Sequence, residues 1–240
     1  MSLKVTILGC GSSGGVPLIT GDWGTCDPSN PKNNRTRASV LVQTQGLNIL
    51  IDTSTDLRQQ LLRAGVTHID AVLYTHTHAD HTFGIDELRQ FYMKHRRSIP
   101  IYADAASLAY LQRTFAYIFQ ETDPLYPAFL KGNVFEDRTF NIQGVKITPY
   151  LQNHGSHHSF GFRIGDFAYS TDFKDIPAES LTKLAKLKVW IVDCLRDEPH
   201  KTHSHYAHTM ELIAQLEPQH AILTRMTQHL DCEVLRLRCP

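Results

Sequence analysis

One six-residue segment, HTHADH, carries four side chains able to bind a metal ion: His76, His78, Asp80 and His81. Three of them are imidazoles, which suit ions such as zinc, and the carboxylate can serve a second, harder ion. The segment follows residues 71–74, an apolar run with the length and composition of a buried strand. The end of such a strand is where α/β proteins bind ligands, and a merely polar loop there would bury unpaired groups at a cost. The sequence therefore predicts a metal site.

The fourteen histidines of the chain are unevenly distributed. They gather at residues 76–81, 154–158 and 200–208, as expected of a metal site that is assembled from several loops. The five cysteines include no CxxC pair and are odd in number. This pattern argues against a disulfide scaffold and against a cysteine-rich zinc knuckle, and it favours a reducing compartment.

Length and charge limit the number of domains and the kinds of partner that the protein can have. The 240 residues suffice for one substantial domain, and we expect residues 1–240 to form it. Lysine plus arginine and aspartate plus glutamate both number 24, so net charge gives no argument for a nucleic-acid or anionic-membrane partner. The first ten residues lack the pattern of a signal peptide, and no apolar run reaches the roughly 20 residues of a membrane span. We expect a cytoplasmic protein without a membrane partner.

Residues 9–15, GCGSSGG, match the GxGxxG pattern of dinucleotide-binding folds. That pattern requires a helix directly after the glycines and an acidic residue at the end of a second strand. Here Val16 and Pro17 follow, and Asp27 lies in the turn sequence Cys-Asp-Pro. A dinucleotide fold is therefore disfavoured, although the backbone amides of this loop could contact an anion.

Apolar periodicity predicts alternating strands and helices along the chain. A helix capped by Ser54 or Thr55 is expected to bury Leu57, Leu61 and Leu62 and to stop at Gly65. Strands are predicted at residues 4–8, 38–43, 47–51, 71–74, 99–102, 145–150, 159–164, 167–170, 189–193 and 221–223. The remaining helices are predicted at 83–95, 105–119, 176–187 and 208–216. The β-rich and helical order occurs twice, which favours two mixed sheets back to back with helices outside.

The HTHADH segment after a buried strand resembles the HxHxDH signature of the metallo-β-lactamase superfamily. Further motifs of that family occur in order: Asp52 ends a strand, His154 follows another in Asn-His-Gly, and Asp172 ends Ser-Thr-Asp. GCGSSGGVP, WGTCDP, NPKNNR and DHTFGIDELR are similar to the subgroup of the PhnP-like cyclic phosphodiesterase of the phosphonate pathway. The resemblance covers nearly the whole chain and implies an α/β fold, the four-layer αββα sandwich.

The resemblance also implies a function and a set of ligands. The chain would be a metal-dependent hydrolase, a phosphodiesterase that cleaves a small or cyclic, ribose- or nucleotide-like phosphodiester by a metal-bound hydroxide. Two divalent ions, Zn or Mn, are expected. His76, His78 and His154 would hold one ion, and Asp80, His81 and Asp172 the other, with Asp172 bridging the pair.

Other residues receive supporting roles. Asp52 is expected to orient a histidine ligand, and His203 to lie beside the substrate and either protonate the leaving oxygen or stabilise the transition state. Asp80, His203 and Arg225 are thus the catalytic candidates. A small phosphodiester or nucleotide is the expected partner; nucleic acid is not expected, and a homodimer is compatible with the sequence.

One position departs from the family pattern. A last histidine ligand is expected just after the final strand, where this chain has Leu-Thr-Arg-Met-Thr-Gln-His, and Arg225 and Thr227 occupy its two usual places. An arginine cannot ligate a metal, because its guanidinium stays protonated. Three alternatives stay open: a weak second site, a substitute ligand such as His229 or a water, or a direct grip of Arg225 on phosphate.

Other functions are compatible with the same scaffold. The enzymatic alternative is a thioester or lactone hydrolase, and the other is a metal- or nucleotide-binding relative with an incomplete second site. A tRNA-processing nuclease is disfavoured, because the chain is neutral and has no long basic insertion. The remaining clustered histidines are expected to flank the site or face solvent, and Cys26 is expected to be structural.

Overall fold

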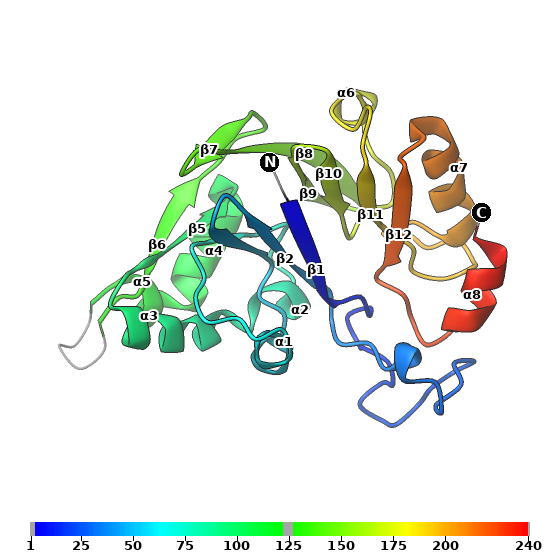
Figure 1. The fold of residues 1–240 in the computed structure, drawn as a ribbon, viewed down its shortest axis with the longest axis horizontal. Coiled ribbons are helices and arrows are strands. Elements are labelled where there is room, and N and C mark those ends of the chain that lie inside the picture. Colours follow the sequence, from blue (N-terminus) through cyan, green and yellow to red (C-terminus); the bar gives the residue numbers. More distant parts are fainter. Residues whose placement is uncertain (1–2, 122–126, 240) are drawn as a thin grey trace. The chain divides into compact units, whose positions relative to one another are not determined.

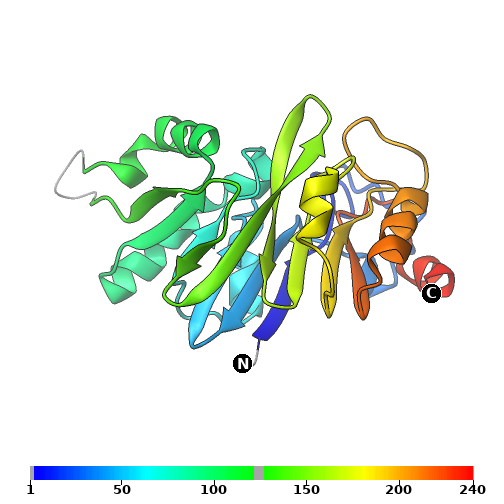
Figure 2. The same ribbon diagram turned by 90° about the horizontal axis from the view of Figure 1, so that it is seen from above.

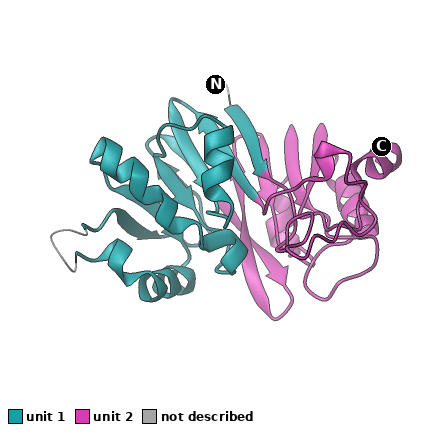
Figure 3. Ribbon diagram, turned by 90° about the horizontal axis from the view of Figure 1, so that it is seen from below, with its two compact units in different colours: residues 1–8, 39–146 teal, residues 9–38, 147–240 magenta. Residues whose placement is uncertain are grey.

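The computed structural model of the chain describes residues 3–121 and 127–239 (Figure 1). The chain divides into two compact units, which Figure 3 distinguishes by colour. Unit 1 comprises residues 1–8 and 39–146, and unit 2 comprises residues 9–38 and 147–240.

Unit 1 contains a six-stranded mixed sheet in the order β1-β2-β3-β4-β5-β6. Strands β2 and β3 form an antiparallel pair, and β3 to β6 run parallel to one another. The strands are β1 Leu3–Gly9, β2 Ser39–Thr44, β3 Leu47–Ile51, β4 Ala71–Leu73, β5 Ile99–Ala103 and β6 Leu130–Val134. Since β3 and β4 are parallel, the residues that follow them meet at one edge of this sheet.

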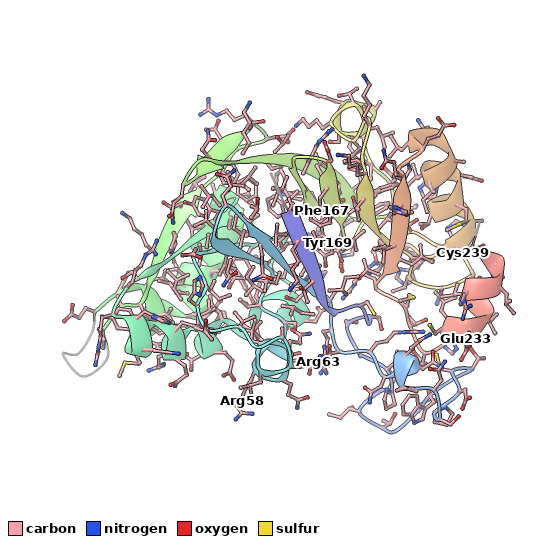
Figure 4. The ribbon with its side chains drawn as sticks, viewed as in Figure 1. Arg58, Arg63, Phe167, Tyr169, Glu233 and Cys239 are labelled. Atoms are coloured by element: carbon pink, nitrogen blue, oxygen red, sulfur yellow. The ribbon has the colours of Figure 1, made fainter. Side chains whose placement is uncertain are left out.

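The helices of unit 1 lie alongside its sheet (Figure 2). They are α1 Leu57–Arg63, α2 Ala79–Thr82, the 3-10 helix η2 Ile85–Leu88, α3 Arg89–His95, α4 Ala105–Thr114 and α5 Ala116–Phe119. Leu57 and Leu61 of α1 join a buried core with Leu50 and Val72 of the sheet. Arg63, labelled in Figure 4, donates to the backbone oxygen of Leu8 and so joins α1 to β1.

Unit 2 is built on a sheet in the order β12-β11-β10-β9-β8-β7. Its strands are β7 Phe140–Ile142, β8 Val145–His154, β9 His157–Ile164, β10 Phe167–Ser170, β11 Val189–Asp193 and β12 His220–Thr224. By residue number β7 and the first two residues of β8 belong to unit 1. Strand β9 is antiparallel to β8 and β10, whereas β10, β11 and β12 are parallel. The carboxyl ends of β8, β10, β11 and β12 therefore lie at the same edge.

The helices of unit 2 are η1 Pro31–Asn33, α6 Ala178–Thr182, α7 Tyr206–Leu216 and α8 Cys232–Arg238. Leu212 of α7 packs in a core cluster with Trp190 of β11. Helix α8, which the sequence did not predict, is capped by Asp231 and carries Glu233, labelled in Figure 4. Within the described part of the chain, no helix has the length and apolar character needed to cross a membrane.

The segment between β1 and β2 is fastened to the loop that precedes α8. Arg35 is buried, and its guanidinium donates to the backbone oxygens of Thr227, at 3.2 Å, and of Leu230, at 2.7 Å. It also lies 3.9 Å from the Sγ atom of Cys26, which is buried. No helix follows residues 9–15, so this glycine-rich loop is not that of a dinucleotide fold.

Two hairpins, one in each unit, share a detail. In unit 1 the Oγ atom of Ser39 donates to the backbone oxygen of Asp52 at 2.9 Å, and in unit 2 the Oγ atom of Ser159 donates to that of Asp172 at 2.8 Å. Both pairs are 13 residues apart in the chain. Both aspartates have a positive φ, 63° and 51°, and lie one or two residues after the second strand of the hairpin.

Several predicted elements differ from the observed ones. Helix α1 begins at Leu57, and Leu62 is 67% exposed, so its predicted burial was wrong. The helix predicted at 83–95 is divided into η2 and α3, and the one at 105–119 into α4 and α5, at Phe115. Strand β8 continues beyond its predicted end to His154, because Gln152, although buried, donates to the Oγ atom of Ser159 and is accommodated in the sheet.

Candidate metal centre

The HTHADH segment of unit 1 folds into a compact group of donors. It continues from β4, and His78 is the residue before α2, whose first turn carries Asp80 and His81. The ring centroid of His76 lies 4.5 Å from that of His78 and 4.4 Å from that of His81. His76 and His81 are buried, His78 is exposed, and the Oδ2 atom of Asp80 lies 3.3 Å from the Nε2 atom of His81.

The buried carboxylate of Asp52 contacts this group. Its carboxylate accepts hydrogen bonds from the backbone N–H and the hydroxyl of Thr75, both at 2.8 Å, and lies 2.7 Å from the Nδ1 atom of His81. The predicted contact of Asp52 with a histidine of this group is therefore present, and the histidine is His81. Burial raises the pKa of Asp52, against the opposing effects of His81 and Thr75.

Asp52 is also connected to His76, through the hydroxyl of Thr75. The Oγ1 atom of Thr75 lies 3.0 Å from the Nδ1 atom of His76. Because this hydroxyl donates to Asp52, it accepts from the Nδ1–H group of the imidazole, which leaves the lone pair on Nε2. A carboxylate behind a histidine sets the same tautomer in metal sites generally. The donors of unit 1 therefore fit a zinc- or manganese-type ion.

Unit 2 gathers its own donors at the shared edge of its sheet. His154 is the last residue of β8, Asp172 follows β10, Asp193 ends β11 and Arg225 follows β12. The ligand atoms of Asp172, Asp193 and His203 all lie within 4.8 Å of one another. Polar side chains at the carboxyl ends of neighbouring strands are the arrangement that binds ligands in α/β proteins.

His154 is held from behind by a backbone oxygen. Its Nδ1 atom lies 2.7 Å from the carbonyl oxygen of Thr202, so Nδ1 carries the proton and Nε2 offers the lone pair. Nε2 lies 3.9 Å from the Oδ2 atom of Asp172. The following residue, Gly155, has φ +67°, and a Cβ atom there would lie 2.5 Å from the Cγ2 atom of Thr202. The glycine permits the close approach that orients His154.

His203 forms a pair with a carboxylate that the sequence analysis did not select. Its Nδ1 atom lies 2.9 Å from the Oδ2 atom of Asp193, and its Nε2 atom lies 3.8 Å from the Oδ2 atom of Asp172. Burial lowers the pKa of His203, but the charges of the two aspartates outweigh it, and the pKa is raised. The available signal for Asp193 was its position at the end of a buried strand.

Arg225 forms an ion pair with Asp172. Its Nη2 atom donates to Oδ2 at 2.8 Å, and its Nε atom lies 2.8 Å from Oδ1. Arg225 is only 2% exposed, Asp172 is fully buried, and the arginine has φ +64°. The residue that replaces the expected last ligand thus faces both oxygens of the expected bridging aspartate. His229, the considered substitute, is exposed and belongs to none of the possible metal-binding groups in the described residues.

A polar cavity of about 550 Å³ lies beside His154 in unit 2. Its wall contains two exposed lysines, one carboxylate and several uncharged polar groups. The lining residues are Asn153, Gly155, Ser156, Lys174, Asp175, Lys201 and Thr202. No large apolar side chain is among them, and the two lysines outnumber the one carboxylate, so the cavity is better suited to an anionic group than to a hydrocarbon chain.

The chain is similar to known proteins over most of its length. A model of the beta-lactamase superfamily domain matches residues 47–226. The crystal structure of a diphosphatase from the PhnP family has a TM-score of 0.92 and 34% sequence identity, and the match covers 100% of this chain and 92% of that one.

Two curated relatives match at lower coverage of their own length. An octanoyltransferase of Porphyromonas gingivalis is 32% identical over 230 residues, which is 95% of this chain and 46% of that protein. A ribonuclease Z of Bradyrhizobium diazoefficiens is 42% identical over 138 residues, which is 56% of this chain and 46% of that protein. The chain spans about half the length of these curated relatives.

Proposed function

Because the chain belongs to the metallo-β-lactamase superfamily and, within it, to the PhnP family, we propose that it is a metal-dependent phosphodiesterase acting on a small or cyclic phosphodiester. The fold is the predicted four-layer αββα sandwich. One observation favours phosphate over other substrates of this fold: the polar cavity with two lysines beside His154. Lysine ammonium groups bind phosphate oxygens as point charges.

The proposed ligands are those that the family motifs assign. His76, His78 and His154 are assigned to one ion, and Asp80, His81 and Asp172 to the other, with Asp172 bridging the pair. In this set the Nε2 atoms of His76 and His154 carry the lone pair, as ligation requires. A bound divalent ion supplies a Lewis acid that lowers the pKa of water and neutralises charge on the phosphoryl oxygens.

The remaining steps belong to side chains of the protein. We assign to Asp80 the proton that the attacking water loses. His203, whose Nδ1–H group is held by Asp193, is assigned to donate a proton from Nε2 to the leaving oxygen. The lysines of the cavity would hold the part of the substrate that does not react.

Two alternatives have a specific observation behind them. The match to an octanoyltransferase favours an acyl thioester, and the match to ribonuclease Z favours RNA. The polar cavity lining argues against the octanoyl chain, and the neutral net charge argues against RNA. The single-domain organisation of residues 1–240, the cytoplasmic location and a homodimer remain predictions.

Hydrolysis of bis(para-nitrophenyl) phosphate by protein loaded with Mn²⁺ or Zn²⁺ tests the proposal, with Asp80→Ala as the blank. We expect metal-dependent turnover that is lost in the blank. A 2′,3′-cyclic nucleotide, an octanoyl thioester and a precursor tRNA are then compared as substrates. Turnover of the thioester or the RNA in the absence of any phosphodiester turnover of small substrates would overturn the proposal.

Substitution of the cavity lysines tests the substrate position. Lys174→Ala and Lys201→Ala should raise the KM for an anionic substrate and leave kcat nearly unchanged, because they hold a part of the substrate that does not react. Lys146→Ala, an exposed lysine on β8 outside the cavity, is the matched control.

A further inference from the structure

We infer that Arg225 takes the place of the second metal ion, so that the chain binds one ion where a two-metal relative would bind two. The inference deepens the proposed function and rests on it for the identity of the centre. It concerns the half of the site in unit 2, where every contact that carries it lies.

The first step is the geometry of the aspartate. Asp172 Oδ2 accepts from Arg225 Nη2 at 2.8 Å, and Oδ1 lies 2.8 Å from Arg225 Nε. The hydroxyl of Thr171 also donates to Oδ1, at 2.7 Å. A carboxylate that bridges two ions must direct one oxygen to each. Here each oxygen already accepts one hydrogen bond, Oδ1 from Thr171 and Oδ2 from Arg225, and both lie next to the guanidinium.

The second step is electrostatic. The guanidinium keeps its proton at any ordinary pH, so it cannot yield its place by deprotonation. Arg225 and Asp172 are both buried, and separating a buried pair leaves an uncompensated charge at high cost. A second dication on Asp172 would also lie close to the guanidinium and be repelled by it. Arg225 and a second ion therefore exclude each other.

The third step concerns the two usual positions of the last ligand and the nearby His229. The hydroxyl of Thr227, the other usual ligand position, donates to the backbone oxygen of Leu195 at 3.0 Å. His229 is exposed and outside the possible metal-binding groups. Neither usual position of the last ligand, nor His229, therefore supplies a histidine.

The consequence for Arg225 is a positioning role. The ion pair holds Asp172 with Oδ2 at 3.9 Å from the Nε2 atom of His154, a separation that two ligands of one ion can have. The buried guanidinium supplies a permanent positive charge at the place where a metal ion would supply a charge that can dissociate. Because the guanidinium of Arg225 already contacts Asp172, it is not placed to bind a phosphate with both of its nitrogen atoms.

The test is the number of ions per chain, measured on the full-length protein by elemental analysis and by titration of the metal-free protein with Mn²⁺. We expect one tightly bound ion in the wild type. Arg225→His removes the charge and adds a donor, so we expect two. Arg225→Lys keeps the charge without the fork, so it should still bind one ion.

Electron paramagnetic resonance of the Mn²⁺-loaded proteins gives an independent measurement. The wild type should give the spectrum of an isolated ion, and Arg225→His that of two spin-coupled neighbouring ions. Two ions of comparable affinity in the wild type would overturn the inference, even if the histidine variant does not fold. Wild-type binding of one ion with a second roughly 10²–10³-fold weaker would support it.

Stoichiometry does not depend on turnover, so the two proposals can fail separately. One ion per chain without phosphodiester hydrolysis would overturn the proposed function and leave the role of Arg225 intact. Phosphodiester hydrolysis with two tightly bound ions would do the reverse.

Discussion

The Nδ1 atom of His203 lies 2.9 Å from the Oδ2 atom of Asp193, a fully buried carboxylate at the end of β11. The same oxygen accepts the backbone N–H of Phe173 at 3.2 Å. Asp193 is thus fixed by its own backbone environment, and it fixes the imidazole in turn. The Nε2–H of the protonated ring is the group available for a substrate, which is the arrangement expected of a general acid.

Replacing His203 with alanine should slow the reaction to an extent that depends on the leaving group. For a substrate with a poor alkoxide leaving group we expect a loss of about 10²–10⁴ in kcat, the usual contribution of a general acid. For para-nitrophenolate, which leaves without a proton, the loss should be much smaller. Equal losses with both leaving groups would instead indicate that His203 acts in binding or structure.

Replacing Asp52 with asparagine should weaken metal binding through His81 and Thr75. The amide cannot accept from all three donors, so one buried donor loses its partner, at a cost of about 1–3 kcal/mol in the free energy of unfolding. Loss of a carboxylate behind a histidine ligand should also lower metal affinity about 10–100-fold.

Urea unfolding and competition with a chelator measure these two effects. Asp70→Asn is the control, because Asp70 is also buried and accepts the backbone N–H of Asn48, but it lies before the start of β4, whereas Asp52 follows the end of β3. It should lower stability without changing metal affinity. A similar loss of affinity in both variants would contradict the assigned role of Asp52.

Replacing Gly155 with alanine should disturb His154 through Thr202. The position has φ +67°, which costs a non-glycine residue about 1–2 kcal/mol, and the added Cβ would meet Thr202 at 2.5 Å. We expect lower stability and weaker metal binding, measured by unfolding and by chelator competition. Gly165 is a matched control with φ +60° and no atom within 4 Å, so Gly165→Ala should change stability alone.

The ion pair between Asp197 and Arg238 should make stability depend on pH at the acid end. The hydrogen bond with Arg238 lowers the pKa of Asp197 below its ordinary value of 3.8. A lowered pKa in the folded state stabilises the protein above the ordinary value, and this contribution is lost as the pH falls through the folded value.

Thermal unfolding of Asp197→Asn across this range provides the measurement. The variant should unfold at a lower temperature than the wild type near pH 7, and the difference should shrink as the pH falls below 3.8. A difference that is constant with pH would exclude the ion pair as its cause. Arg238 also stacks on Tyr206, with 4.1 Å from its guanidinium carbon to the ring centroid. The Asp197→Asn variant leaves Arg238 in place, so this second contact of Arg238 is present in both proteins that are compared.

Much of the fold could be predicted from local pattern alone. The strand before HTHADH, the strand before Asp52 and the strand before Asp172 all occur where apolar runs end in polar residues. These runs are fully buried, so their composition alone is informative. The sequence predicted that Asp52 contacts a histidine, but it did not predict that this histidine is His81.

The remainder depended on partners that are distant in the chain. Helix α8 packs its Leu235 against Leu230 and Cys194, and neither neighbour is visible in a local window. The end of β8 was hidden because Gln152 is polar, yet its amide also donates to the backbone oxygen of Thr171, 19 residues away. The pairing of Arg225 with Asp172 spans 53 residues, which no spacing rule covers.

The matching serine-to-aspartate hairpins give the chain an internal equivalence. Ser39 relates to Asp52 as Ser159 relates to Asp172, and each hairpin presents its carboxylate in the same left-handed turn. One carboxylate faces the imidazole of His81 and the other the guanidinium of Arg225. The same backbone turn thus holds a carboxylate against an imidazole in one unit and against a guanidinium in the other. If Arg225 replaces an ion as inferred, one substitution in the partner of such a turn changes the number of ions bound.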